Sequence, residues 1–220
     1  MFRIKLIVTG AMEKATLHES LQRVFQTTRA GRNVQWDTPQ KISGATTHRL
    51  SQNHPPSRPM RALAKTMLAE VKGGKTGKPA DMIVAVDDLE LGNLGHEAIV
   101  VQHFRSAMNL ELAVYDPKKR AELRACLGQR CSFHLLSPMV ESYLFGDPEA
   151  LLIADVPRDE KPRLVHPSDV EQFETNDPAW LKDCNDKNME MRQHSPWWCH
   201  ERHPKAYLEH LVRRGGKALR

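Results

Sequence analysis

A continuous apolar run, Met82-Ile83-Val84-Ala85-Val86, constrains the fold of this chain more than any other feature. Asp81 precedes the run, and Asp87-Asp88 follow it. A short apolar run between charged residues is typical of a strand that is buried on both faces, as in a parallel sheet. We therefore expect a central strand here, with an acidic pair at its carboxyl end.

Apolar periodicity elsewhere predicts strands and helices that alternate along the chain. The expected strands are 3–8, 33–36, 82–86 and 131–136, and the expected helices are 11–30, 60–72, 94–109, 117–127 and 204–214, with two short ones starting at 137 and 147. This alternation predicts an α/β fold with a mostly parallel central sheet flanked by helices. Residues 1–155 would form the α/β domain, and 156–220 a C-terminal helical extension packed on it.

The first helix is predicted from four apolar residues at helical spacing, with Gly31 as its end. These residues are Leu17, Leu21, Val24 and Phe25. A mobile loop is expected over 44–59, which is rich in Ser, Thr, His and Pro.

The buried face of one helix and three helix boundaries are also predicted from local residues. Met60, Leu63, Ala64, Met67, Leu68 and Val71 share one face of the helix over 60–72. Gly73-Gly74 would end that helix, and Gly128 would end the helix over 117–127. Ser137-Pro138 would start another helix, with serine as N-cap and proline in the first turn.

Asp87, Asp88 and Glu90 place three carboxylates within four residues at the end of the central strand. Like charges this close destabilise the fold or raise a pKa unless a cation or a basic partner is present. Mg²⁺ prefers such oxygen ligands, and it can assist phosphoryl transfer. A solvated strand end followed by a helix cap explains the local sequence equally well.

Glu13 and Glu141 each stand in the first turn of an expected helix that follows a strand. The functional crevice of an open α/β sheet lies beyond the carboxyl ends of its strands, so both residues could approach the acidic run there. Each one taken alone is also explained as a favourable charge at a helix N-terminus.

Basic residues outnumber acidic ones by 32 to 27, which gives a net charge of +5 and favours contact with a polyanion. The candidate phosphate contacts are Lys75, Lys78, Lys118, Lys119, Arg213 and Arg214. An ordinary basic surface is the alternative. The segment 73–78 lacks the spacing of a phosphate-binding loop and precedes a strand, so it is interpreted as a basic linker.

The C-terminal region has the residue types of a zinc site. Cys184, Cys199, His200 and His203 could be its ligands, although their spacing matches no common zinc module. A hydrogen-bonded loop is the alternative. Four cysteines in 220 residues do not form a disulfide framework, so a reducing, cytoplasmic compartment is expected. No signal peptide, membrane span or membrane partner is expected.

Four segments resemble, in order, a Toprim-like family of unknown function that is related to the nuclease partners of defence ATPases. Residues 6–15 are similar to its first strand and turn, and 83–90 to its acidic strand motif. The segment 137–151, which ends Asp-Pro-Glu-Ala-Leu, is similar to its most specific signature, and 203–208 to its basic C-terminal helix.

The resemblance implies a Toprim-like fold and a nuclease that depends on Mg²⁺ or Mn²⁺. Asp87, Asp88, Glu90 and Glu141 would be the metal ligands, and Glu13, Asp88 and Glu90 the catalytic residues. It also implies an ATPase partner in bacterial defence against phage.

Thr9 stands where Toprim enzymes usually have a glutamate. The alternative to a nuclease is therefore a degenerate binding subunit that docks on an ATPase and senses nucleic acid or a phage protein. The sequence leaves the number of assembled copies open, a homo-oligomer included.

Overall fold

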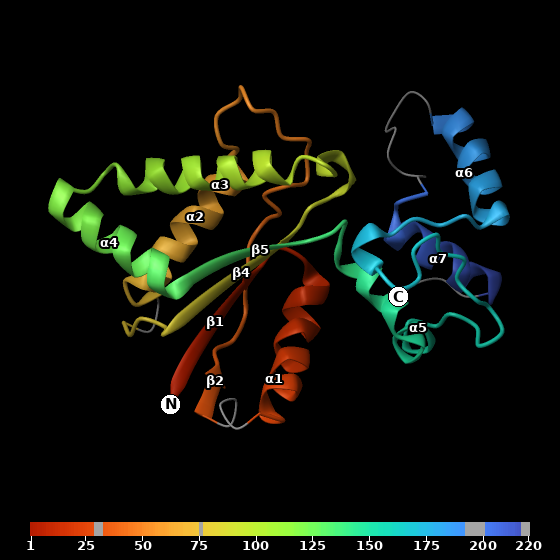
Figure 1. Ribbon diagram of the computed structural model, residues 1–220, viewed down its shortest axis with the longest axis horizontal. Helices are drawn as coiled ribbons and strands as arrows, with labels where there is room; N and C mark the ends of the chain where they lie inside the picture. Colours follow the sequence, from red (N-terminus) through yellow and green to blue (C-terminus); the bar gives the residue numbers. More distant parts are fainter. Residues whose placement is uncertain (29–32, 75–76, 192–200, 217–220) are drawn as a thin grey trace. The chain divides into compact units, whose positions relative to one another are not determined.

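A computed structural model describes residues 1–28, 33–74, 77–191 and 201–216 of the chain (Figure 1). The chain divides into two compact units. The first unit contains Met1–Asp88 and Gly95–Leu135, and the second contains Leu89–Leu94 and Leu136–Arg220. Residues 136–155, expected in the α/β domain, thus belong to the second unit.

The first unit is built on a mostly parallel sheet, as the sequence predicted. Its strands are β1 (Phe2–Val8), β2 (Val34–Trp36), β3 (Gln40–Lys41), β4 (Met82–Asp88) and β5 (Cys131–Leu136). The strand order is β2-β1-β4-β5, and β3 pairs with the end of β1. Strand β1 runs parallel to β2, β3 and β4, with Ile4 opposite Met82 and Val8 opposite Val86.

The two central strands are covered on both faces, because consecutive residues at their carboxyl ends are buried. Leu6, Ile7 and Val8 are buried in β1, and Val86 and Asp87 in β4. Side chains alternate between the faces of a sheet, so a run of buried neighbours requires a layer on each face. The apolar run of β4 therefore forms the central strand that the sequence predicted.

Helices cover both faces of this sheet (Figure 1). They are a five-residue π-helical segment η1 (Glu13–Leu17), α1 (His18–Gln26), α2 (Arg58–Val71), α3 (Glu97–Leu112) and α4 (Pro117–Arg130). Helix α1 lies on one face, and α2, α3 and α4 lie on the other. All six apolar residues predicted for one face of α2 are buried. Ser57 caps α2 by accepting a hydrogen bond from the Met60 N–H, and Gly73 and Gly74 follow its end with positive φ.

The apolar spacing of α1 predicted the helix but not its environment. Every residue of α1 is described, and none of them is buried. Val24 is 63% exposed, and the Phe25 ring meets the edge of Trp36 with 5.7 Å between centroids. Gly31, the predicted end, lies outside the described residues.

Gly128 does not end α4, so that prediction was wrong. The helix continues to Arg130, and β5 begins at the next residue. Asp116 caps the other end, where its side chain accepts a hydrogen bond from the Lys119 N–H.

The second unit is a helical assembly around the buried Tyr207. Its elements are the 3-10 helices η4 (Leu91–Asn93), η5 (Val140–Gly146) and η6 (Val170–Gln172), and the helices α5 (Pro148–Ile153), α6 (Pro178–Met191) and α7 (Pro204–Arg214). Tyr207, Leu208, Leu211 and Val212 of α7 pack with Phe145, Leu151, Phe173 and Trp180 in its core.

The helix predicted to start at Ser137-Pro138 is absent from this described segment. A 3-10 helix begins at Val140 instead, with no side-chain cap, and the Ser137-Pro138 peptide bond is cis. The Ser137 hydroxyl donates to the Glu171 carbonyl rather than capping a helix. The second start signal was correct, because Asp147 caps α5 by accepting a hydrogen bond from the Glu149 N–H.

Candidate functional site

The order of the strands places a topological switch point at the carboxyl ends of β1 and β4. From β1 the chain continues to β2 on one side and later returns to form β4 on the other side. Crevices for ligands in open α/β sheets form where the connections diverge in this way. Thr9-Gly10 follow β1 at this point, and Asp87-Asp88 end β4.

Asp87 is buried at this edge, with both carboxylate oxygens hydrogen-bonded. The Thr9 hydroxyl donates to Oδ1 at 2.5 Å, and the Ala45 N–H donates to Oδ2 at 2.9 Å. Burial raises the pKa of Asp87 above its ordinary value, because it penalises the charged form, while the bonds from Thr9 and Ala45 act in the opposite direction. Both bonds therefore favour the ionised carboxylate at this strand end.

Glu13 is also buried, and its carboxylate folds back onto the turn after β1. The Gly10 N–H donates to Glu13 Oε1 at 3.1 Å. A Cβ on Gly10 would lie 1.8 Å from Glu13 Oε2, so the absence of a side chain at position 10 is what lets the carboxylate approach. Glu13 and Asp87 are thus each bonded to one residue of the same two-residue turn.

The loop after β3 completes this edge, and sequence reasoning missed its contribution. Ala45 and Thr46 are buried, although they belong to a segment expected as a mobile loop. The Thr46 hydroxyl donates to the backbone carbonyl of Asp88, while Ala45 bonds the Asp87 side chain. The small residues Gly44 and Ala45 are the signal that could have indicated close packing on a strand end.

The four predicted metal ligands divide between the two units. Asp87 and Asp88 end β4 in the first unit, whereas Glu90 and the buried Glu141 belong to the second. Within the described ranges, no group of three or more His, Cys, Asp and Glu side chains is arranged to hold a metal ion. The ligand roles of these four residues stay predictions.

Glu90 has a backbone conformation that residues other than glycine rarely adopt. Its φ is 65° and its ψ is 149°, and its N–H donates to the Pro138 carbonyl at 2.8 Å. Conformations of this kind cost of the order of 1–3 kcal/mol, and they persist where the surrounding structure enforces them, often at functional sites.

Glu90→Gly should therefore be more stable than Glu90→Ala by about 1–2 kcal/mol, since only glycine relieves the backbone strain. Both variants lack the Glu90 side chain, so the comparison isolates the backbone. Urea unfolding of the two proteins followed by circular dichroism measures the difference. Equal midpoints, or a more stable alanine variant, would show that residue 90 carries no strain.

The described half of the predicted zinc site has other roles. Cys184 is buried in the apolar core of the second unit. His203 caps α7, where its Nδ1 accepts a hydrogen bond from the Ala206 N–H at 3.2 Å. Cys199 and His200 lie outside the described residues, so the zinc site stays a prediction.

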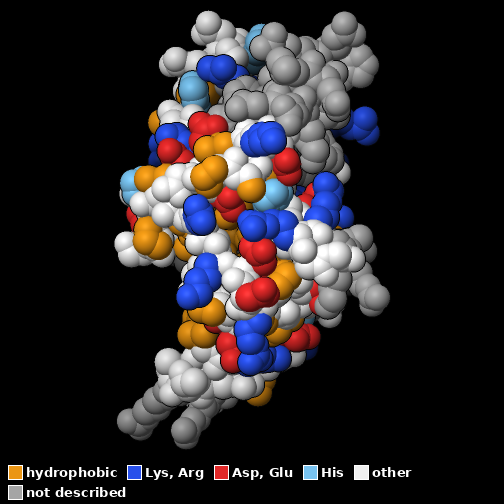
Figure 2. All heavy atoms as spheres, turned by 90° about the vertical axis from the view of Figure 1, so that its right-hand side faces the viewer, with side chains coloured by type: hydrophobic (Ala, Val, Ile, Leu, Met, Phe, Trp, Pro, Cys, Tyr) orange, Lys and Arg blue, Asp and Glu red, His pale blue; other side chains and the backbone are white. Residues whose placement is uncertain are grey.

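Several of the predicted phosphate contacts pair with carboxylates of their own chain. Lys119 lies 3.2 Å from Glu122, and Arg213 lies 3.3 Å from Glu209. Figure 2 shows Lys and Arg side chains interspersed with Asp and Glu on the face that it presents. Lys78 and Lys118 are exposed, whereas Lys75 lies outside the described residues. Their contact with nucleic acid stays a prediction.

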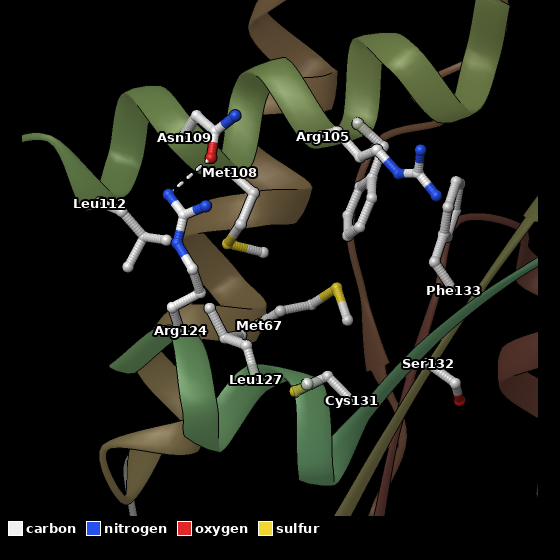
Figure 3. Close-up of a pocket in the computed structure, with 12 residues that line it drawn as sticks. Met67, Arg105, Met108, Asn109, Leu112, Arg124, Leu127, Cys131, Ser132 and Phe133 are labelled. Carbon is white, nitrogen blue, oxygen red and sulfur yellow. Dashed lines mark hydrogen bonds between the residues drawn. The ribbon is translucent and has the colours of Figure 1, made fainter. Parts of the chain in front are cut away.

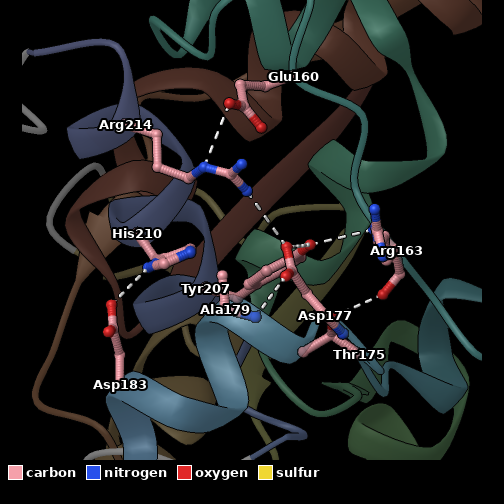
Figure 4. Close-up of polar contacts among 9 residues, drawn as sticks. All are labelled: Glu160, Arg163, Thr175, Asp177, Ala179, Asp183, Tyr207, His210 and Arg214. Carbon is pink, nitrogen blue, oxygen red and sulfur yellow. Dashed lines mark hydrogen bonds and ion pairs between the residues drawn. The ribbon is translucent and has the colours of Figure 1, made fainter.

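A buried polar network in the second unit was not predicted from the sequence (Figure 4). The Tyr207 hydroxyl donates to Asp177 Oδ2 and accepts from the Arg163 N–H, both at 3.0 Å. Asp177 Oδ1 accepts from the Ala179 N–H at the start of α6, and Arg214 lies 3.6 Å from Asp177 Oδ2. Burial raises the pKa of the Tyr207 hydroxyl, so the hydroxyl stays neutral and donates to Asp177.

Arg214, proposed as a phosphate contact, therefore pairs with Asp177 and also with Glu160 at 3.2 Å. These ion pairs join the end of α7 to the start of α6 and to the segment before η6. In this structure Arg214 serves the packing of the second unit.

Comparisons of the chain with family models, with curated proteins and with solved structures give no match. The structure supports the α/β, Rossmann-like class of the first unit. The Toprim-like assignment stays a prediction.

Proposed function

We propose that the first unit binds a divalent cation, Mg²⁺ or Mn²⁺, at the carboxyl ends of β1 and β4 and hydrolyses phosphodiester bonds of nucleic acid. One observation carries the proposal: two buried carboxyl groups, Glu13 and Asp87, flank the Thr9-Gly10 turn at the switch point of the sheet. Buried carboxylates at a ligand-binding edge are oxygen donors of the kind that hard cations take.

Glu13, Asp87 and Asp88 are proposed to act directly at this edge, and Asp87 also holds the turn in place through Thr9. Asp88 follows the buried Asp87, and its carbonyl is fixed by Thr46. A cation bound there would neutralise phosphate charge and lower the pKa of a bound water. The ligand roles of Glu90 and Glu141 stay predictions from the sequence, and an ATPase partner in phage defence stays a proposal based on the resemblance.

The test measures cleavage of plasmid DNA and of single-stranded RNA in Mg²⁺ or Mn²⁺. Samples with EDTA serve as the metal-free control. Cleavage should be lost in Glu13→Gln and in Asp88→Asn. It should persist in Glu122→Gln, which alters an exposed carboxylate paired with Lys119. Cleavage that survives both site substitutions would contradict the assignment of this edge.

A degenerate binding subunit is the second candidate, and the hydrogen bonding of Asp87 favours it. Both oxygens of that carboxylate already have donors, and Thr9 occupies the position of the usual glutamate. This candidate predicts no cleavage with any metal, but binding of labelled nucleic acid that weakens steeply with salt. Retained binding after Glu13→Gln would favour it over the nuclease.

A cytoplasmic location is part of the proposal. Cys126, Cys131 and Cys184 are free thiols in the described part of the chain, which suits a reducing compartment. No described helix has the length and the apolar character that crossing a membrane requires.

A further inference from the structure

The first unit contains a half-open pocket of about 440 Å³ on the face of its sheet that α2, α3 and α4 cover (Figure 3). Its walls come from α2, α3, α4 and the start of β5. Pockets of about 300–1,000 Å³ that are mostly apolar and carry a few polar groups are typical of small-molecule sites. The pocket shares no lining residue with the edge formed by Glu13 and Asp87, so it is a separate candidate site.

The interior of the pocket is apolar and adaptable. Phe104 and Phe133 are stacked, with 4.6 Å between ring centroids. Met67 and Met108 extend into the space between the helices (Figure 3), and thioether chains adjust to ligands of different shape. Burial raises the pKa of Cys131 to about 12, so its thiol is a neutral part of the wall.

The charged groups of the pocket are both cationic. Arg105 and Arg124 contribute guanidinium groups, and among the described lining residues none is Asp or Glu. Arg124 donates to the Asn109 side-chain carbonyl at 3.0 Å, a neutral partner that leaves its charge uncompensated. Within the described ranges, neither guanidinium forms an ion pair. An anionic group therefore complements this lining.

Gly128 keeps one wall of the pocket open. It lies inside α4, where glycine is a poorer helix former than alanine. A Cβ built on Gly128 meets no described atom within 4 Å, so packing does not require glycine here. Space for a ligand explains a residue that otherwise only weakens its helix.

We propose that this pocket binds a small amphipathic carboxylate, with its apolar chain among Met67, Met108 and Phe104 and its head group at one of the two guanidinium groups, that of Arg105 or that of Arg124. A medium-chain acyl carboxylate has this chemistry. The proposal is independent of the nuclease proposal, because neither site uses residues of the other.

Decanoate is the probe, and decanol, which has the same chain without the charge, is its control. Titration calorimetry should give decanoate an affinity about tenfold or more above that of decanol, since hydrogen bonds to a charged partner carry the difference. The double variant Arg105→Gln/Arg124→Gln should remove this preference. Equal affinities for the two probes in the wild-type protein would overturn the assignment of the head group.

Methyl-labelled methionine locates the binding in NMR spectra. Decanoate should shift the methyl signals of Met67 and Met108, assigned with the variants Met67→Leu and Met108→Leu. No saturable shift at either methyl would overturn the proposal, whichever other signals move.

Two substitutions of Gly128 form a matched pair, and neither is expected to destabilise the fold. Gly128→Ala and Gly128→Leu should both raise the thermal midpoint, because each improves helix propensity. Gly128→Ala should bind decanoate nearly as the wild type does, whereas Gly128→Leu should bind at least about tenfold more weakly as its side chain occupies the space. Wild-type affinity in the stable Gly128→Leu protein would exclude this pocket as the site.

Discussion

Replacement of Tyr207 by alanine is expected to lower the free energy of unfolding of the second unit by about 3–5 kcal/mol, the usual cost of removing a large buried aromatic side chain. Tyr207 is fully buried, and its ring lies against those of Phe145, Phe173 and Trp180, with centroids 5.7, 6.2 and 6.0 Å away. The cavity left by the ring would open at the meeting point of η5, α6 and α7. Urea unfolding followed by far-UV circular dichroism measures the loss.

Tyr207→Phe is the matched control, because it keeps the ring and removes only the hydroxyl. Its cost should be about 1–3 kcal/mol, since the buried Asp177 loses a donor and the half-buried Arg163 N–H loses its acceptor. Hydrogen exchange at α7 should increase in both variants, and more in the alanine variant. A Tyr207→Ala protein within about 1 kcal/mol of the wild type would contradict the packing described for this unit.

The parts of the fold that sequence predicted correctly are those set by local patterns. The apolar run of β4 needed only its own residues to indicate a strand with both faces covered. The spacing of Met60 to Val71 identified the buried face of α2, and Asp147-Pro148 marked the start of α5. In each case the deciding interactions lie within one element or one turn.

The errors have a common physical cause, which is competition from distant parts of the chain. Helix α1 has apolar spacing, yet Val24 and Phe25 remain exposed because burial depends on what the rest of the chain provides. Ser137-Pro138 has the local chemistry of a helix start, but its hydroxyl bonds a carbonyl 34 residues away. Gly128 has open space around it, so nothing forces a helix end there.

The sequence predicted only part of the candidate site, because the rest depends on contacts between distant parts of the chain. Strand ends show where Asp87 and Asp88 should be, because the carboxyl edge follows from the fold class. The sequence could not show that Thr9 and Ala45, distant by 78 and 42 residues, would donate to the Asp87 carboxylate. Nor could it show that Glu13 would turn back onto Gly10, which depends on the backbone path after β1.

Thr9→Val should lower the free energy of unfolding at neutral pH by about 1.5–3 kcal/mol, because it removes a hydrogen bond to a buried charged group without changing the side chain's shape. The Thr9 hydroxyl and Asp87 Oδ1 are 2.5 Å apart, and both residues are buried. Thr47→Val is the control, since Thr47 is exposed and its hydroxyl donates to the Gly44 carbonyl at 3.4 Å. It should stay within about 0.5 kcal/mol of the wild type.

The pH profile of Thr9→Val distinguishes a lost hydrogen bond from lost packing. Burial raises the pKa of Asp87, so its contribution to stability is fully present below its ordinary pKa and is lost as the pH rises through the raised one. The Thr9 bond lowers that pKa, so the valine variant should have a still higher pKa and lose more stability on the way to neutral pH. Unfolding measured in EDTA buffers should therefore give profiles that meet at acid pH and separate as the pH rises. A difference in the free energy of unfolding that stays constant across the pH range would assign the effect to packing. No difference would show that the Thr9 hydroxyl does not stabilise the Asp87 carboxylate.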